Sequence, residues 1–239
     1  MLYVDIEKRL DRFTLKAKFE CDGEPSALFG ASGSGKSMSL KCIAGIEKPD
    51  KGIIKLNDRI LFDSESKINL PPQKRRVGYL FQEYALFPNM NVTQNIMTGL
   101  RQYHRTERAE KAAELIKRFR LDGLEKARIN TLSGGEKQRV ALARIFASSP
   151  EVLLLDEPFS SLDTYLKLEL IPYIKDIIEG FGGESVLVSH DISEVFSLCK
   201  RVTPLESGVT QNTVDTSEFY KQIKEEYEKA GVLLPGYEL

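Results

Sequence analysis

The sequence contains few cysteines and no long apolar run. Its three cysteines, Cys21, Cys42 and Cys199, are widely separated and form no CxxC pair, so neither a disulfide framework nor a zinc site is expected. The longest unbroken aliphatic run is four residues, whereas a helix needs roughly 20 apolar residues to span a bilayer. The N-terminal stretch MLYVDIEKRLDRF is too charged for a secretory signal. We therefore expect a protein that works in a reducing compartment. If it works at a membrane, another protein must hold it there.

The sequence also lacks an excess of charge of either sign. Its 34 basic and 35 acidic residues give a net charge of −1, so overall charge gives no reason to expect nucleic acid or anionic lipid as a partner. The 239 residues are 41% hydrophobic and 29% charged, which is typical of a globular protein long enough to bury a sizeable core. The sequence shows no internal repeat, low-complexity segment or long linker.

Short apolar strands alternate with helical stretches along most of the chain. Strands are predicted at residues 2–6, 13–19, 26–29, 52–56, 59–62, 75–82, 151–158 and 184–190. Helices are predicted at residues 35–45, 92–100, 106–120, 136–148 and 216–230, the last of them charged and exposed, and a further helix, disturbed by Pro172, follows the strand at 151–158. The first two strands are expected to be antiparallel, whereas the later alternation predicts an α/β fold with a mostly parallel sheet. Ligands of such sheets bind at the carboxyl ends of the strands, here after Phe29, Leu155 and Val188.

The stretch GASGSGKS follows a predicted strand and matches the phosphate-loop pattern GxxxxGK[ST]. Its glycines permit backbone angles that let successive N–H groups point inward around a phosphate. Lys36 can reach the outer phosphates, and the Ser37 hydroxyl is placed to bind Mg²⁺. The strand–loop–helix context argues against a glycine-rich turn that binds nothing, so the loop predicts binding of a nucleoside triphosphate. The candidate binding residues are Gly30, Ala31, Ser32, Gly33, Ser34, Gly35, Lys36, Ser37 and Met38.

Two acids follow the apolar run VLLL at the end of another predicted strand. Asp156 occupies the place where phosphate-loop enzymes hold Mg²⁺, and Glu157 is then available to orient or deprotonate an attacking water. The alternative is an exposed acidic strand end without a ligand. His190 ends the next strand, and Gln82 follows the strand VGYLF. In the functional interpretation, His190 contacts the γ-phosphate or the water, and Gln82 binds the metal or positions the water. A purely structural role is the alternative for both residues.

The stretch TLSGGEKQRV is a second candidate anion site. Ser133 suits a helix N-cap, and Gly134 and Gly135 open a helix-forming run whose N-terminus would attract an anion. Glu136 follows Ser133 by three residues, so a local capping box is an alternative that does not exclude phosphate binding. These residues raise the question of why one chain carries two phosphate-binding devices.

In chain order, these motifs resemble those of the ATPase subunits of ATP-binding cassette (ABC) transporters. The matching motifs are Walker A (GASGSGKS), the glutamine loop (Gln82), the signature (LSGGE), Walker B (LLLDE), the D-loop (SSLD, 160–163) and the switch histidine (His190). The resemblance covers the chain from Tyr3 to about Val209. It implies a single domain of residues 1–239: a phosphate-loop NTPase core, an N-terminal antiparallel β subdomain and a helical subdomain at about 83–148. No C-terminal regulatory domain is expected.

The resemblance implies a role for each matched residue. Glu157 would be the general base, and His190 would contact the γ-phosphate. Gln82 would touch the metal or water and sense a membrane partner. The metal ligands would be Ser37, Gln82 and Asp156. The residues acting across a head-to-tail dimer, at ATP bound to the second copy, would be Ser133, Gly134, Gly135 and Asp163.

The resemblance further implies ATP and Mg²⁺ as cofactors and several partners. These are a second copy of the chain, integral membrane permease subunits and, indirectly, an extracytoplasmic solute-binding protein. The expected location is the cytoplasmic face of the cell membrane. The stretch QEYALFPNMNVTQNI would border the groove that receives the permease, with Tyr84, Leu86 and Phe87 as an apolar docking surface. That these three side chains are simply core is the alternative.

Two stretches indicate an importer. NLPPQKRRVGYLFQEYALFPNMNVTQNI is similar to importers of molybdate, sulfate, iron and polyamines, and EKRLDRFTLKAKFE to those of molybdate or tungstate. Met38 stands where threonine is usual, Glu136 stands where glutamine is common, and Phe13 or Leu10 takes the place of the aromatic residue that stacks on adenine. The expected function is ATP hydrolysis that energises solute uptake. The alternatives are another solute, a soluble ABC ATPase outside transport, and a regulator without hydrolysis, against which Glu157 and His190 argue.

Overall fold

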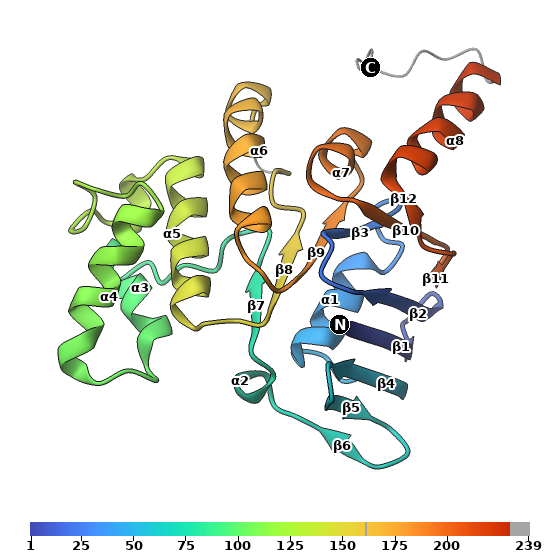
Figure 1. Cartoon of the computed structure of the whole chain (residues 1–239), viewed down its shortest axis with the longest axis horizontal. Helices are drawn as coiled ribbons and strands as arrows, with labels where there is room; N and C mark the ends of the chain where they lie inside the picture. Colours follow the sequence, from blue (N-terminus) through green and yellow to red (C-terminus); the bar gives the residue numbers. More distant parts are fainter. Residues whose placement is uncertain (161, 230–239) are drawn as a thin grey trace.

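The structure is a computed structural model that describes residues 1–160 and 162–229. Its strands form one mixed sheet in the order β6-β5-β4-β1-β2-β11-β10-β3-β9-β8-β7, and β12 pairs with β10 (Figure 1). The strands are β1 (Leu2–Arg9), β2 (Thr14–Cys21), β3 (Ser26–Phe29), β4 (Lys51–Leu56), β5 (Arg59–Asp63), β6 (Ile68–Asn69), β7 (Val77–Leu80), β8 (Val152–Asp156), β9 (Glu184–Ser189), β10 (Arg201–Glu206), β11 (Val209–Thr210) and β12 (Val214–Asp215).

The α-helices lie around this sheet (Figure 1). They are α1 (Lys36–Ala44), α2 (Pro72–Arg75), α3 (Val92–Met97), α4 (Arg105–Arg118), α5 (Gly134–Ala147), α6 (Thr164–Glu179), α7 (Ile192–Leu198) and α8 (Thr216–Lys229). α3, α4 and α5 lie together at the end of the molecule away from β1 and β2, in the segment where the sequence predicts a helical subdomain. Within the described residues, no helix combines the length and the apolar composition that crossing a bilayer requires.

The N-terminal strands form the antiparallel part of the sheet. β1 pairs with β2 from Leu2↔Cys21 to Arg9↔Thr14, and its other edge pairs with β4. Alternate residues of β2 are buried, as expected for a strand with one face on a core and the other in water. β4 and β5 pair on either side of Asn57, which adopts a positive φ of 51° in the turn. The predicted antiparallel pair and the predicted hairpin are both confirmed.

The parallel part of the sheet is the run of neighbouring strands β10, β3, β9, β8 and β7. Every residue of β8 is buried. Val152 and Leu154 pack in one core together with α1, whereas Leu153 and Leu155 pack in a second core with α5 and α6. The strand is therefore covered on both faces, as its continuous apolar sequence predicts. The predicted α/β class is confirmed.

β10 is not among the strands predicted from the sequence. It contains Pro204, and proline is disfavoured inside strands because it has no N–H to donate. Away from β3, the edge of β10 pairs with β12 at Arg201 and Val202 and with β11 at Leu205 and Glu206. Pro204 lies between these two pairings and takes part in neither. The strand can therefore contain a proline, which is disfavoured inside strands.

α8 is half-buried rather than exposed. The sequence predicts a charged, exposed helix over residues 216–230, and this is wrong for its first turns, because Phe219 and Tyr220 are buried. The Phe219 ring lies against that of Phe29 at a centroid distance of 5.3 Å. The helix is thus amphipathic and is anchored beside the end of β3. Position 230, at the predicted end of the helix, lies outside the described residues.

The Arg75 side chain hydrogen-bonds to carbonyl groups at the C-terminal end of α1. Its side chain is fully buried. It donates to the carbonyl oxygens of Leu70, Cys42 and Ile43 and to the amide oxygen of Asn69, each at 2.8 Å. No carboxylate among the described residues forms an ion pair with it. Burial lowers the pKa of Arg75 to about 10. The partial negative charge at the end of α1 therefore stabilises the guanidinium group.

Replacing Arg75 with methionine is expected to lower the free energy of unfolding by about 3 kcal/mol, because four buried oxygens lose their donor. Urea unfolding followed by circular dichroism measures the change. Arg76→Met is a matched control. Arg76 is 64% exposed, and among the described residues its side chain forms an ion pair only with Glu151, so its removal is expected to cost less than about 1 kcal/mol. Equal losses in the two variants would contradict the role assigned to Arg75.

Candidate functional site

The carboxyl ends of β3, β9 and β8 are neighbours at one edge of the sheet. The strand register pairs Phe29 with Ser189 and Val188 with Asp156. The phosphate loop after β3, His190 after β9 and Glu157 after β8 therefore start from adjacent positions. The structure confirms that these three strand ends meet.

The loop of residues 30–35 connects β3 to α1 in a tight turn. Gly35 ends the loop with a φ of 112°, a left-handed conformation that favours glycine. In α1, all of which is described, no side chain caps the N-terminus and the first turn holds no acidic residue. The N–H groups at the start of α1 are thus available to an anion, which the helix dipole also favours.

Lys36 folds back over this loop. Its Nζ donates to the carbonyl oxygens of Gly30 at 2.8 Å and Ala31 at 3.0 Å, and it lies 3.8 Å from Glu157 Oε1. Burial lowers the pKa of Lys36, and the carboxylates of Glu157 and Asp156 oppose this shift. The amine therefore sits between the loop and the acids, where it can bind phosphate oxygens.

Asp156 ends β8 with its side chain on the α1 side of the sheet, the face shared by Leu154. Ser37 Oγ donates to Asp156 Oδ1 at 2.7 Å, and the Tyr79 hydroxyl donates to Oδ2 at 2.7 Å. The structure thus brings together two of the oxygen ligands that the sequence predicts for Mg²⁺. Tyr79 is not among the candidate residues predicted from the sequence. The period-two alternation of VGYL, which places Tyr79 on this face, is the signal that could have found it.

Glu157 reaches the same site through an unusual backbone conformation. An extended strand would send its side chain to the face opposite Asp156. Instead its φ is 45°, a region that costs a residue with a side chain about 1–3 kcal/mol. Its Oε1 consequently lies 3.8 Å from Lys36 Nζ and 3.4 Å from His190 Nδ1. The predicted base, lysine and histidine therefore surround one small space.

Both neighbours of His190 are fixed by side-chain contacts. Ser189 Oγ donates to Glu194 Oε2 at 2.5 Å. Lys167 of α6 forms ion pairs with Asp191 and, at 2.7 Å, with Glu194. The imidazole itself is 52% exposed. The backbone around His190 is therefore tied to α6, while the ring stays accessible to a ligand.

Gln82 faces the turn that contains Glu157. Its Nε2 donates to Ser160 Oγ at 3.0 Å, and Ser160 Oγ donates in turn to the carbonyl oxygen of Glu157 at 3.0 Å. Gln82 is thus linked to the backbone of the predicted base. The role of Gln82 as a metal ligand stays a prediction.

The signature residues begin α5 and are capped locally. Ser133 Oγ accepts from the Glu136 N–H at 3.3 Å, and Glu136 Oε2 accepts from the Ser133 N–H at 2.7 Å. This capping box was the local alternative, and it is present. The box uses the N–H groups of Ser133 and Glu136, whereas the first N–H groups of a helix have no partner within it. Those of Gly134 and Gly135 therefore remain available to a phosphate.

The D-loop leads from β8 into α6 and packs against the signature. Asp163 caps α6, since its Oδ1 accepts from the Leu166 N–H at 3.0 Å. A Cβ atom on Gly134 would come within 2.9 Å of the Leu162 side chain, so the glycine permits this close approach. Ser161 of the D-loop lies outside the described residues. The role of Asp163 across a dimer stays a prediction.

A comparison with known families agrees with this geometry. The family model described as "ABC transporter" matches residues 15–160, which hold the phosphate loop, the signature and both acids. The chain belongs to the ABC transporter family. The resemblance seen in the motifs is therefore confirmed.

Two proteins named "Molybdenum import ATP-binding protein ModC" are similar to this cassette. The one from Brucella melitensis is 40% identical over 235 residues, which make up 98% of this chain and 65% of that protein. The one from Paramagnetospirillum magneticum is 38% identical over 208 residues, which make up 87% of this chain and 57% of that protein. The cassette thus spans less than two thirds of the length of these relatives.

A solved structure has the same fold. The dimeric ATP-binding cassette MJ0796, described as bound to ADP and Pi in a post-hydrolysis state, is 26% identical and superposes with a TM-score of 0.74. The match covers 90% of this chain and 99% of that one. The expected fold class, an α/β fold of the ABC ATPase type, is confirmed, and the sheet as a whole is mixed.

The cassette's own residues fit a magnesium–nucleotide complex. The start of α1 lacks a cap, Lys36 points across the loop, and the Ser37 and Asp156 oxygens are hydrogen-bonded to each other at 2.7 Å. No group of three or more His, Cys, Asp or Glu side chains in the described part of the chain could hold a metal alone. Mg²⁺ commonly takes one or two carboxylates together with substrate phosphates and water. A site completed by the nucleotide's own phosphates therefore suits these residues.

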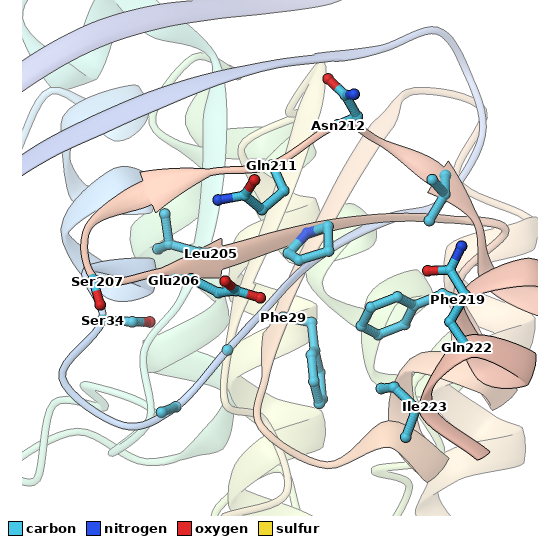
Figure 2. A pocket seen from close by; sticks show the side chains of 14 residues that line it. Phe29, Ser34, Leu205, Glu206, Ser207, Gln211, Asn212, Phe219, Gln222 and Ile223 are labelled. Atoms are coloured by element: carbon cyan, nitrogen blue, oxygen red, sulfur yellow. The ribbon is translucent and has the colours of Figure 1, made fainter. Parts of the chain in front are cut away.

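A cavity of about 750 Å³ opens beside the phosphate loop of the cassette (Figure 2). Ala31 and Ser34 line it from the loop, and Phe219 and Ile223 line it from α8. It lies on the β10 side of β3, whereas β9 and β8 are on the other side. The two acids and His190 do not line this cavity. The hydrolytic groups are therefore outside it.

The Phe13 side chain lies close to Gly35, the residue that precedes α1. A Cβ atom on Gly35 would come within 3.6 Å of the Phe13 ring and within 2.8 Å of Leu15. Both Phe13 and Leu10 are partly buried against the core that contains α1. Phe13 is thus placed beside the phosphate loop, where an adenine-stacking residue is expected. The stacking itself stays a prediction.

The predicted docking surface is only partly exposed in the cassette. Tyr84 is 7% exposed and belongs to a core, so the prediction is wrong for this residue and the core alternative holds. Leu86 is partly buried, whereas Phe87 is 44% exposed. Arg144 holds this loop in place, because its guanidinium group donates to the Tyr84 carbonyl at 2.9 Å and lies 5.4 Å from the centre of the Phe87 ring. Phe87 is thus exposed on a loop, residues 84–87, that Arg144 holds in place (the braced loop).

Proposed function

We propose that this chain is the ATP-binding and ATP-hydrolysing subunit of an ABC importer. One observation carries the proposal: Glu157 Oε1 lies 3.8 Å from Lys36 Nζ and 3.4 Å from His190 Nδ1, next to the hydrogen-bonded pair of Ser37 and Asp156. A phosphate-binding cation, a metal site and a carboxylate base converge at one place. These are the parts that hydrolysis of a phosphoanhydride requires.

In the proposed hydrolysis of ATP, each residue of the site has its own role. Lys36 and the N–H groups at the start of α1 bind the phosphates, and Ser37 and Asp156 would hold Mg²⁺, with Gln82 as the third predicted ligand. When bound, the metal neutralises charge on the phosphate oxygens. Glu157 accepts a proton from water as the water oxygen bonds to the γ-phosphorus. The bond from that phosphorus to the β-phosphate oxygen breaks, which yields ADP and phosphate, while His190 contacts the γ-phosphate.

The signature supplies the reason for a second copy of the chain. In the proposed head-to-tail dimer, Ser133 and the N–H groups of Gly134 and Gly135 bind the γ-phosphate held by the partner's phosphate loop. This answers why one chain carries two phosphate-binding devices, since each site takes one device from each copy. ATP then joins the two subunits, and its hydrolysis releases them. The similar MJ0796 cassette is described as dimeric, which supports this arrangement.

Membrane permease subunits are the partners that the dimer would drive. Phe87, exposed on the braced loop next to Gln82, fits a docking position from which Gln82 could relay contact to the Glu157 turn. The chain would act at the cytoplasmic face of the membrane, with an extracytoplasmic protein delivering the solute. Molybdate is proposed as that solute, because similar proteins are named molybdenum import proteins. Uptake measured against sulfate as competitor distinguishes the two oxyanions.

Mixing two inactive variants tests the shared site. Lys36→Ala and Ser133→Arg are each expected to lack activity alone. In an equimolar mixture, half of the dimers carry one intact site, so about a quarter of the wild-type rate is expected to return. Lys36→Ala mixed with Glu157→Gln is the matched control. Because Lys36 and Glu157 belong to the same site of one copy, no intact site forms and no activity returns. Absence of rescue in verified Lys36/Ser133 heterodimers would refute the shared site.

A further inference from the structure

Asp156 is held by a hydrogen bond on each of its carboxylate oxygens. Ser37 binds Oδ1 and the Tyr79 hydroxyl binds Oδ2, both at 2.7 Å. Asp156 and Tyr79 are both buried. The contact with Ser37 is part of the predicted metal site. The contact with Tyr79 comes from a different strand, β7.

The fold gives Tyr79 little freedom to leave this position. β7 and β8 are parallel neighbours in which Tyr79 pairs with Leu154, so its ring lies on the face where Asp156 follows two residues later. The Phe81 ring packs on Tyr79 at a centroid distance of 4.4 Å. The hydroxyl is therefore held where it donates a hydrogen bond to Asp156 Oδ2.

We infer that Tyr79 is a positioning residue for the metal site: its hydroxyl fixes the Asp156 carboxylate so that Oδ1 stays beside Ser37. The inference rests on the proposed function, because it assigns Tyr79 to the same magnesium-dependent site. Mg²⁺ tolerates little deviation from octahedral geometry, so a carboxylate free to rotate binds it less well. Loss of a hydrogen-bonding partner behind a metal ligand typically costs about 10–100-fold in metal affinity or activity.

Tyr79→Phe tests this inference, since it removes one oxygen and keeps the ring. Binding of Mn²⁺ as a probe is measured by electron paramagnetic resonance at saturating ADP, and binding of ADP in EDTA by calorimetry. The expected result is a Mn²⁺ affinity lower by about 10-fold or more, with unchanged ADP affinity in EDTA. The free Mg²⁺ concentration for half-maximal ATP turnover should rise by a similar factor.

Tyr173→Phe is the matched control. The Tyr173 hydroxyl on α6 is buried and has no hydrogen-bond partner among the described residues, so its removal should leave both affinities unchanged. The inference is overturned if Tyr79→Phe binds Mn²⁺ as the wild type does. It is also overturned if the variant loses ADP affinity equally with and without metal, because that indicates a general structural effect. Failure of the wild-type protein itself to bind Mn²⁺ with ADP or to hydrolyse ATP would instead reject the proposed function.

Discussion

Replacing Glu157 with glutamine is expected to lower kcat for ATP hydrolysis by about 10²–10⁴-fold, the range over which a general base contributes. The carboxamide has nearly the same size and shape but cannot take a proton from water. The other groups of the site remain, so ATP and Mg²⁺ should bind with affinity close to that of the wild type. A steady-state ATPase assay and calorimetric titration with ATP provide the two measurements.

The matched control for this substitution is Glu110→Gln, on the exposed surface of α4. It makes the same chemical change away from the site and should leave kcat unchanged. Unaltered turnover in Glu157→Gln would remove Glu157 from the role of base. The φ of 45° at Glu157 makes this test informative. A strained backbone that serves only to bring a carboxylate to the site has little purpose if the carboxylate is dispensable.

Replacing Lys36 with alanine is expected to lower kcat/KM by about 10²–10³-fold, which is the usual effect of removing one charged or polar group that stabilises the transition state. The lysine amine lies between the loop carbonyls and Glu157, so its loss leaves the phosphates without their nearest cation. The ATPase assay reports kcat/KM, and calorimetry shows how much of the loss is in binding.

Lys41→Ala provides the comparison, because Lys41 lies in the last turn of the same helix. It removes a positive charge near the C-terminus of α1, which is expected to cost about 0.3–1 kcal/mol of stability, with activity retained. Activity of Lys36→Ala equal to that of Lys41→Ala would contradict the assignment of the phosphate loop.

The arrangement of the strand ends could be predicted from the sequence. The phosphate loop, the two acids at the end of β8 and His190 each follow a short apolar run, and such runs form parallel strands whose carboxyl ends share one edge. Local patterns are enough here, because each motif has its own strand, loop or helix beside it. The capping box of Ser133 and Glu136 could also be predicted, since it depends on residues three positions apart.

Other parts of the site depend on contacts between distant segments, which no local pattern reports. The backbone of Glu157 turns back because of a tight turn after β8, where its N–H donates to the Val188 carbonyl at 3.0 Å. Tyr79 meets Asp156 only through the register of two strands that are far apart in sequence. Arg75 falls in the strand predicted at 75–82, but it is the last residue of α2, and its side chain reaches the carbonyl groups at the C-terminal end of α1. Burial of Tyr84, against its expected exposure, has the same origin.

Sedimentation of Glu157→Gln with and without ATP and Mg²⁺ tests most directly whether ATP joins two copies of the chain. The variant should be monomeric without nucleotide and should become a stable dimer at saturating ATP, because the bound triphosphate is no longer hydrolysed. Adding Ser133→Arg to the same variant should abolish the dimer, since the arginine side chain obstructs the tip of α5. A Glu157→Gln protein that binds ATP yet stays monomeric at saturation would contradict the account.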